Sequence, residues 1–268
     1  MKFFKSVSLK DVQTVYGGFE GRLWELVMGE QIHFGGFESS MELATKAGVK
    51  EGMRGVDFCC CTGAGMRFLI RFIKVANMTG VDATAEMINL GKKRTQDEGF
   101  ADKIEFILSD VCKNSLPSEE FDFVWGEDAW CYVEDKSKLI SEAARIVKRG
   151  GIICFTDWIE GKNKLSNIET ERFLKFMKFP SYCNIEDYCL LLKKNGCEIM
   201  LAEDTKRFAP CCDLYIDMLT KQLTYDALKI IGYDMGLMQF LGGEMDFMRG
   251  LAKTGKIAQG LFVAVKKN

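Results

Sequence analysis

The sequence predicts an α/β fold with a doubly wound, mostly parallel sheet, N-terminal helices and a helical cap. Short apolar runs of strand length alternate with amphipathic stretches of helical period from residue 55 to residue 158. Strands that alternate with helices form parallel sheets with right-handed crossovers. The three prolines of the chain and the lack of a low-complexity linker leave no clear domain break.

The elements are expected in the following order. Residues 9–30 carry one apolar helical face, and Ser39-Ser40 is placed to cap a helix over 41–47. Strands are predicted at 55–59, 76–82, 103–110, 121–128 and 151–158, helices around 65–74, 84–97 and 134–147, and a last strand in GLFVAVKK. We therefore expect N-terminal helices over 1–50 that close the site, a ligand-binding core over 51–160, and further core strands over 161–268 with helical cap insertions at about 161–181 and 211–254.

Charge and hydropathy narrow the classes of ligand. The chain has 36 Lys and Arg residues against 38 Asp and Glu residues, so it lacks the basic stripe that nucleic acid or an anionic membrane requires. No segment reaches the roughly 18 apolar residues of a membrane span, and MKFFKSVSLKDV has no signal-peptide pattern. These features predict a cytoplasmic protein with a small-molecule ligand.

The eleven cysteines are expected to be reduced. Their number is odd, the chain is long, and no secretory signal precedes it, so a disulfide framework is disfavoured. No Cys-x-x-Cys pair occurs and His33 is the single histidine, so no metal site is predicted. Most of these cysteines are interpreted as small apolar packing residues.

Carboxylates end two consecutive predicted strands. Asp82 closes the strand in TGVDAT, about twenty residues after the glycine-containing turn, and Asp110 closes the strand in ILSDV. The carboxyl ends of parallel strands form the ligand site of such sheets, and a carboxylate there accepts two ribose hydroxyls side by side. The alternative for each aspartate is a helix cap, and for the glycines close packing alone. Together they favour a nucleoside site.

The segments around these carboxylates resemble the class I S-adenosylmethionine-dependent methyltransferases. VDFCCCTGAG resembles the Asp-x-Gly-x-Gly-x-Gly loop of that family, TGVDATAEMINLGKKR its ribose-binding segment, IEFILSDV its adenine-contacting segment and RIVKRGGIICFTDW its fifth strand. MGEQIHFGGF and GEDAWCYVEDK are similar to the sarcosine/dimethylglycine and phosphoethanolamine N-methyltransferase group.

The resemblance implies a Rossmann-like methyltransferase fold with a seven-stranded sheet, with S-adenosylmethionine as the cofactor and S-adenosylhomocysteine as its product. By the same resemblance, the residues that bind the cofactor are Cys59, Cys60, Cys61, Gly63, Gly65, Asp82, Ala83, Asp110, Val111 and Glu127. The catalytic residues that it implies are Tyr16, His33, Asp128 and Tyr132.

Cys59 and Cys61 stand where the family has glycine. Cysteine at a positive φ costs on the order of 1 kcal/mol or more. We expect the backbone to shift slightly, which leaves Gly63 and Gly65 to approach the cofactor closely. The alternative is that cofactor affinity is weak or lost, which would leave a ligand-binding protein of the same fold.

The implied chemistry is methylation of an amine nitrogen of a small molecule, with O-, S- or C-methylation as the alternative. An amine must lose a proton before it attacks, so a general base or a water path is needed. Tyr132 stands where the resembled group has a catalytic histidine and Tyr16 where it has a tyrosine; His33 could restore the titrating group, although a structural histidine is equally expected. Asp128 is expected to contact the amine, or else to cap a helix.

Aromatic and basic residues supply further candidates. One or two of Trp125, Trp130, Tyr132 and Trp158 are expected to line the pocket and hold a methylated ammonium. Arg22, Arg207 and Arg249 are candidates for binding a substrate carboxylate or for a solvated surface. The Met-rich region 211–254 is expected to cover the site as a lid, with plain packing or a homodimer interface as alternatives.

Overall fold

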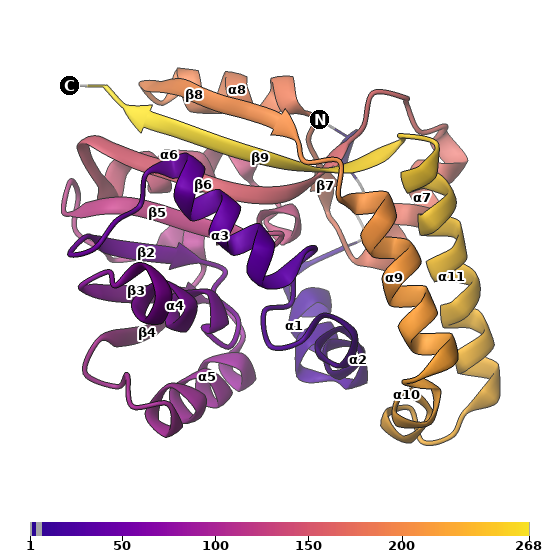
Figure 1. Ribbon diagram of the computed structural model, residues 1–268. Helices are drawn as coiled ribbons and strands as arrows, with labels where there is room; N and C mark the ends of the chain where they lie inside the picture. Colours follow the sequence, from indigo (N-terminus) through magenta and orange to yellow (C-terminus); the bar gives the residue numbers. More distant parts are fainter. Residues whose placement is uncertain (1, 4–6, 268) are drawn as a thin grey trace.

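The computed structural model describes residues 2–3 and 7–267, and a seven-stranded sheet forms its centre (Figure 1). The strand order is β4-β3-β2-β5-β6-β9-β8. The strands are β2 (Arg54–Phe58), β3 (Asn77–Asp82), β4 (Ile104–Leu108), β5 (Phe121–Glu127), β6 (Val147–Glu160), β8 (Cys197–Asp204) and β9 (Ile257–Lys266). The predicted doubly wound, mostly parallel sheet is confirmed.

Parallel pairing positions the ligand site. Strands β2 to β6 are parallel to their neighbours, whereas β9 runs antiparallel between β6 and β8. The chain order reverses between β2 and β5, and such a switch point opens a crevice at the carboxyl ends of the strands. Asp57 pairs with Trp125 across this point, so the loops after β2 and β5 leave the sheet side by side.

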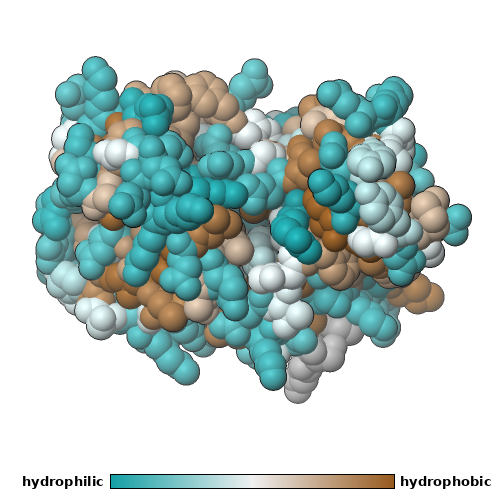
Figure 2. All heavy atoms as spheres, turned by 90° about the horizontal axis from the view of Figure 1, so that it is seen from below, coloured by the Kyte–Doolittle hydropathy of each residue, from teal (hydrophilic) through white to brown (hydrophobic). Residues whose placement is uncertain are grey.

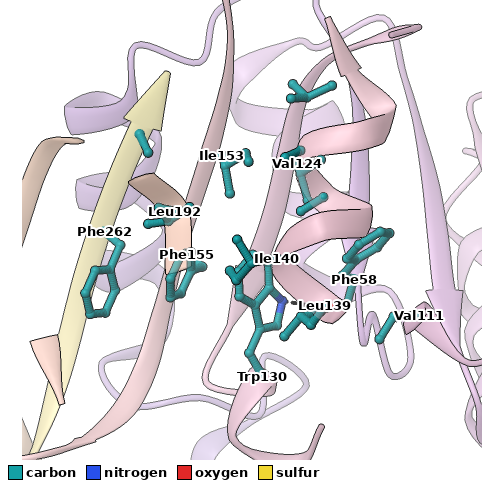
Figure 3. Packing of buried hydrophobic residues seen from close by; sticks show 14 of the residues in the cluster. Phe58, Val111, Val124, Trp130, Leu139, Ile140, Ile153, Phe155, Leu192 and Phe262 are labelled. Carbon is teal, nitrogen blue, oxygen red and sulfur yellow. Dashed lines mark hydrogen bonds between the residues drawn. The ribbon is translucent and has the colours of Figure 1, made fainter. Parts of the chain in front are cut away.

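Helices cover both faces of the sheet, as the apolar runs require. One face carries α3 (Gly36–Ala47), α4 (Ala64–Phe68), the π-helical turn η1 (Leu69–Ile73) and α5 (Ala85–Asp97). The other carries α6 (Lys136–Ile146) and α8 (Ile185–Lys194), whose Leu139, Ile140 and Leu192 pack with the strand residues Phe155 and Phe262 (Figure 3).

The predicted helix over 9–30 consists of two helices, α1 (Leu9–Gly17) and α2 (Phe19–Met28). Gly18 breaks it with an extended backbone at φ −106° and ψ −162°. A side chain at Gly21 would lie 2.7 Å from the Tyr16 carbonyl oxygen. The paired glycines therefore allow α2 to turn back tightly on α1.

The predicted cap at Ser39-Ser40 is wrong. Helix α3 begins at Gly36, five residues earlier than expected, and both serines lie buried inside it. Their hydroxyls make tertiary hydrogen bonds, Ser39 with Arg207 and Ser40 with Glu127. Serine was expected to cap a helix because its hydroxyl commonly binds nearby backbone N–H groups. Here both hydroxyls form hydrogen bonds with residues far away in the sequence, so the serines lie inside the helix.

A helical cap packs beside the sheet. It consists of α7 (Asn167–Met177), α9 (Phe208–Lys221), α10 (Thr224–Ile230) and α11 (Met235–Lys253), which pack with α2 (Figure 1). These helices and α2 enclose an apolar cavity of about 180 Å³. Hydrophobic residues reach the surface of the right-hand lobe in Figure 2, which these helices form. Within the described residues, no helix is long and apolar enough to cross a membrane.

Three further details differ from the predicted elements. Strand β8 was not anticipated, because its residues show no clear alternation of burial. Strand β6 starts at Val147, before the predicted 151, and accommodates the extra length by a register shift against β5. A two-stranded sheet forms between β1 (Lys2–Phe3) and β7 (Ser181–Tyr182).

Candidate functional site

A cavity of about 400 Å³ opens at the carboxyl ends of the parallel strands. Its wall combines the loops after β2, β3, β4 and β5 with residues of α1 and of the loop before α3. All fourteen predicted site residues except Gly63 line it. The topology therefore brings residues from position 16 to position 132 around one space.

The loop after β2 keeps a glycine-like backbone despite its cysteines. Cys59 has φ 63° and Cys61 has φ 49°, both in the left-handed region, and Gly63 follows at φ 74°. Both cysteines thus adopt the conformation that glycine favours. Hydrogen bonds from the Cys59 and Cys60 N–H groups to the Val81 carbonyl hold this conformation. The loop stores strain of about 1–2 kcal/mol at each cysteine.

Asp82 fastens this loop to β3. Its Oδ2 accepts the Cys61 N–H at 2.9 Å and its Oδ1 accepts the Thr84 N–H at 2.8 Å. Burial raises the pKa of Asp82, while these N–H groups counteract the shift. Asp82 also lines the cavity, where its carboxylate can accept a ligand hydroxyl.

Asp110 and Val111 form the next part of the wall. Asp110 Oδ1 accepts the Cys112 N–H at 2.9 Å and so caps the 3₁₀ turn η2 (Val111–Lys113). The sequence left two roles open for Asp110, a helix cap or a ligand contact. In the structure it caps η2 and also lines the cavity. The Ala83 carbonyl accepts a hydrogen bond from Gln13 of α1 at 2.7 Å, which closes α1 over this edge.

Asp57 belongs to the site, although it was not among the predicted residues. It lies 4% exposed at the end of β2, and a methyl group added to Gly65 would lie 3.5 Å from Asp57 Oδ2 and 2.9 Å from Glu127 Oε2. Burial, and then the charges of Glu127 and Asp82, raise the pKa of Asp57 well above its usual value. Asp57 could have been predicted as a site residue, because it is the aspartate at the start of the loop motif in VDFCCCTGAG. The carboxyl groups of Asp57 and Glu127 form the floor beneath Gly65.

His33 is held by one ring nitrogen only. Its Nε2 lies 3.2 Å from Ser40 Oγ and 3.3 Å from Glu127 Oε1. Because Ser40 Oγ donates to Glu127 at 2.7 Å, Nε2 must carry the proton that Ser40 and Glu127 accept. Nδ1 is buried without a hydrogen-bond partner. The arrangement presents a basic lone pair on a side chain that lines the cavity.

Asp128 clamps the loop that carries His33. Its Oδ2 accepts the Phe34 N–H at 2.8 Å, and both its oxygens accept from the Gln259 amide, at 2.9 and 2.7 Å. The residue itself has φ 50°. Burial raises the pKa of Asp128, and the donors oppose that shift. Its N–H donates to the Thr156 carbonyl of β6. Because its carboxylate accepts from Phe34 and Gln259 and the next helical turn, η3, is capped by Ala129, Asp128 caps no helix.

Tyr16 and Tyr132 meet edge to face, with ring centroids 5.4 Å apart. Tyr16 lies in α1, and Tyr132 ends the 3₁₀ turn η3 (Trp130–Tyr132) after β5. A hydrogen bond joins their hydroxyls, and burial raises the pKa of each phenol. Both are therefore protonated near neutral pH and can donate hydrogen bonds but not remove a proton.

A buried polar cluster of Asp157, Lys136 and Tyr188 packs against η3. Asp157 of β6 accepts the Cys131 N–H at 3.0 Å and the Tyr188 hydroxyl, and Lys136 Nζ donates to the Cys131 carbonyl at 3.1 Å. Burial raises the pKa of Asp157 to about 6, and Lys136 counteracts the shift. Sequence reasoning quoted Asp157 within FTDW but gave it no role.

The aromatic residues and the Met-rich region that the sequence suggested as parts of the pocket differ in whether they line the cavity. Of the four aromatic residues, Tyr132 lines the cavity, whereas Trp125, Trp130 and Trp158 are buried in the three hydrophobic clusters. The expected lid over 211–254 does not line the cavity either. Among the described residues, the wall near the predicted catalytic side is completed by Val7, Ser8, Leu9, Val12 and Pro180.

The comparisons with known proteins agree with this geometry. Residues 56–155 match the family model described as a methyltransferase domain. Phosphoethanolamine N-methyltransferase 2 of Haemonchus contortus, solved with phosphomonomethylethanolamine and S-adenosylhomocysteine, superposes with a TM-score of 0.86 at 22% identity over 99% of this chain and 62% of that chain. The family model and the fold agree on one assignment. Residues 56–155 thus match a methyltransferase domain, and the chain has the fold of these methyltransferases.

Two other methyltransferases are similar to this chain. Phosphoethanolamine N-methyltransferase 1 of Arabidopsis thaliana is 24% identical over 74% of this chain and 40% of its own length. A putative sarcosine dimethylglycine methyltransferase of Galdieria sulphuraria has a TM-score of 0.83 at 17% identity, covering 93% of this chain and 97% of that chain. This methyltransferase thus spans about two fifths of the plant relative.

The donor set of this methyltransferase fits the cofactor of the family. Asp82 would accept the ribose hydroxyls, and Asp110 would face the adenine side. The floor formed by Asp57 and Glu127 is suited to the ammonium group of the cofactor. The side chains of Cys59 and Cys61 line the cavity beside this floor.

Proposed function

We propose that this protein methylates an amine nitrogen of a small molecule with S-adenosylmethionine. The observation that carries the proposal is the buried, unpartnered Nδ1 of His33, a residue that lines the cavity and whose Nε2 is fixed by Ser40 and Glu127. A sulfonium methyl group is already activated and needs no acid. An ammonium acceptor, in contrast, must first give up a proton, and His33 supplies a group for that step.

The proposed steps balance as follows. His33 Nδ1 takes the proton of the acceptor ammonium, while Glu127 stabilises the imidazolium through Nε2. The freed nitrogen lone pair forms the bond to the methyl carbon as the carbon–sulfur bond breaks, and the bonding electrons stay on sulfur. His33 then releases its proton to solvent. Holding the two reacting atoms in line can contribute roughly 7–11 kcal/mol.

Tyr16 and Tyr132 have a positioning role in this proposal. Because both phenols stay protonated, they cannot replace the histidine of the resembled group as a base. Their hydroxyls can donate hydrogen bonds, and their rings give the acceptor side an aromatic wall. Asp128 holds the loop of His33 and adds negative charge near the acceptor ammonium.

Calorimetric titration and product release test this function in two stages. Titration with S-adenosylmethionine and S-adenosylhomocysteine should give binding of each; no binding up to millimolar concentration would support a protein that has lost its cofactor. Release of S-adenosylhomocysteine is then followed with amines, including sarcosine, dimethylglycine and phosphoethanolamine, and with thiols and phenols. Turnover on thiols or phenols alone would overturn the amine assignment.

Variants of His33 test its role as the base. His33→Asn should lower kcat by about 100-fold or more, the usual contribution of a general base, while cofactor affinity stays unchanged. The matched control is Ser40→Ala, which keeps the imidazole but removes one of the partners of Nε2 and should lower kcat less. If His33→Asn retains the full rate over the pH range 6 to 9, another group or water accepts the proton.

A further inference from the structure

We propose that the methyl acceptor is an amine that carries no carboxylate or phosphate group. This inference rests on the proposed amine methylation at the same site, and it narrows the class of substrate. The observation behind it is the balance and the placement of charge around the cavity. The similar proteins named above act on amines with an acidic group, so the inference also separates this chain from them.

Carboxylates dominate the wall of the cavity. Eight acidic residues of the described chain line it: Glu30, Asp57, Asp82, Asp110, Glu127, Asp128, Glu134 and Asp135. Two lysines line it, Lys113 and Lys138. Asp82, Asp110, Asp57 and Glu127 are assigned to the cofactor, which brings an ammonium, a sulfonium and a carboxylate. Of the other four, Glu30 is paired with Arg67 at 2.7 Å. Asp128, Glu134 and Asp135 then stand against the two lysines, and this small surplus of negative charge favours a cationic acceptor.

Both lysines belong to elements that pack together, η2 and α6. Lys113 ends η2, which begins directly after Asp110, and Lys138 lies in the first turn of α6. Lys138 Nζ is also paired with Glu142 at 3.2 Å. Tyr16 and His33 lie on other elements, α1 and the loop before α3. An acidic acceptor group placed there would therefore meet carboxylates rather than these ammonium groups.

The arginines that could hold a substrate carboxylate are engaged elsewhere. The guanidinium of Arg207 bonds to Ser39, Gln259 and Glu42. Arg249 pairs with Asp246 at 2.7 Å, and Arg22 is exposed on α2. None of the three is among the described residues that line the cavity. The specific pairing that an acidic group requires when it is desolvated is thus not built into this wall.

The acceptor side offers apolar and aromatic surface instead. Val12 and Tyr16 lie in α1, Tyr132 packs edge to face against Tyr16, and Pro180 completes the wall next to β7. Such a surface can hold the hydrocarbon part of an amine and attract its ammonium to the aromatic faces. An aliphatic or arylalkyl amine fits both the charge and the lining.

Pairs of amines that differ only in the acidic group test the inference. Release of S-adenosylhomocysteine is measured with ethanolamine against phosphoethanolamine, dimethylamine against sarcosine, and tyramine against tyrosine. We expect kcat/KM to be about tenfold or more higher for the preferred, acid-free partner of each pair, because like charges at close range disfavour the acidic one. A higher kcat/KM for phosphoethanolamine or sarcosine would overturn the inference and leave amine methylation intact. If no amine is methylated, the proposed function itself fails.

Reversing one charge in the cavity wall tests whether wall charge causes the preference for acid-free amines. Glu134 is exposed, lines the cavity and lies two residues after Tyr132. Glu134→Lys should narrow the preference for the acid-free amines about threefold or more. Glu186→Lys makes the same change of charge at an exposed position of α8 outside the cavity and should leave the preference as it is. An equal preference in both variants would show that wall charge does not select the acceptor.

Discussion

The backbone N–H of Phe34 donates to Oδ2 of Asp128 at 2.8 Å, across 94 positions of sequence. This bond joins the loop before α3 to the loop after β5, and Gln259 of β9 donates to the same carboxylate. His33 precedes Phe34, and Glu127 precedes Asp128, so the bond also sets the distance between the imidazole and its carboxylate partner. The candidate base is thus positioned by three segments that are far apart in the chain.

Removal of the Asp128 carboxylate should loosen this arrangement. Asp128→Ala leaves the buried Phe34 N–H without its acceptor, which costs roughly 1–3 kcal/mol of unfolding free energy. The Gln259 amide loses its bonds to Asp128 but keeps the one to the Phe34 carbonyl. Asp128→Asn keeps an oxygen acceptor and should lose less. Urea denaturation measures both. If the two variants are equally stable, the clamp contributes little to the fold.

Asp82→Ala should weaken the binding of S-adenosylmethionine at least about tenfold. The substitution removes an ionised acceptor whose hydrogen bonds contribute about 1.5–3 kcal/mol, and it also releases the Cys61 N–H that shapes the loop. Calorimetry provides the dissociation constant. Asp102→Ala, at an exposed position outside the cavity, is the control and should bind normally. Unchanged affinity in Asp82→Ala would remove this residue from the site.

Replacement of Cys61 by glycine should relieve strain in the loop. Cys61 has φ 49°, and glycine at such a φ avoids a penalty of about 1–2 kcal/mol but loses about 0.4–1 kcal/mol through greater freedom of the unfolded chain. A net gain of up to about 1 kcal/mol in unfolding free energy is expected, with cofactor affinity equal or higher. Cys60→Gly is the matched control.

Cys60 differs from its neighbour in both backbone and packing. It is buried against Gly80 and does not have a positive φ, so its replacement by glycine should destabilise the fold through lost packing. Destabilisation by Cys61→Gly as well would mean that the Cys61 side chain stabilises the loop more than its backbone strains it.

Asp157 should make stability depend on pH. Its pKa rises from 3.8 to about 6 in the folded protein, so the folded state binds the proton more tightly than the unfolded chain. This contribution is complete below pH 3.8 and is lost as the pH rises through about 6, a change of about 3 kcal/mol by pH 7. The difference in unfolding free energy between the wild type and Asp157→Asn, measured from pH 4 to pH 7, should fall by about this amount. A constant difference would show that Asp157 does not titrate in this range.

Tyr132→Phe should lower the turnover number and leave cofactor affinity unchanged. The substitution keeps the ring that packs on Tyr16 and Phe179 but removes the hydroxyl that can orient the acceptor. Product release under saturating cofactor measures the first quantity and calorimetry the second. A normal turnover number would assign Tyr132 to packing alone.

Much of the architecture could be predicted because it follows from local patterns. The apolar runs that became β2, β3, β4 and β5 begin and end within two residues of their predicted bounds, since buried parallel strands are continuous apolar segments. Asp82 and Asp110 were expected at strand ends and lie there, because the carboxyl ends of parallel strands share one edge of the sheet. The chemical types of the site residues were thus readable from the chain.

The sequence by itself determined the alternation of strands and helices, the turn after the first core strand and the carboxylates at the strand ends, all of which depend on neighbours within a few residues. Only the tertiary structure decided that Ser40 lies inside α3, that His33 meets Glu127, and that the cap helices stand away from the cavity wall. These relationships join segments tens to hundreds of residues apart, and the burial and hydrogen bonding that fix them arise only when the whole chain packs.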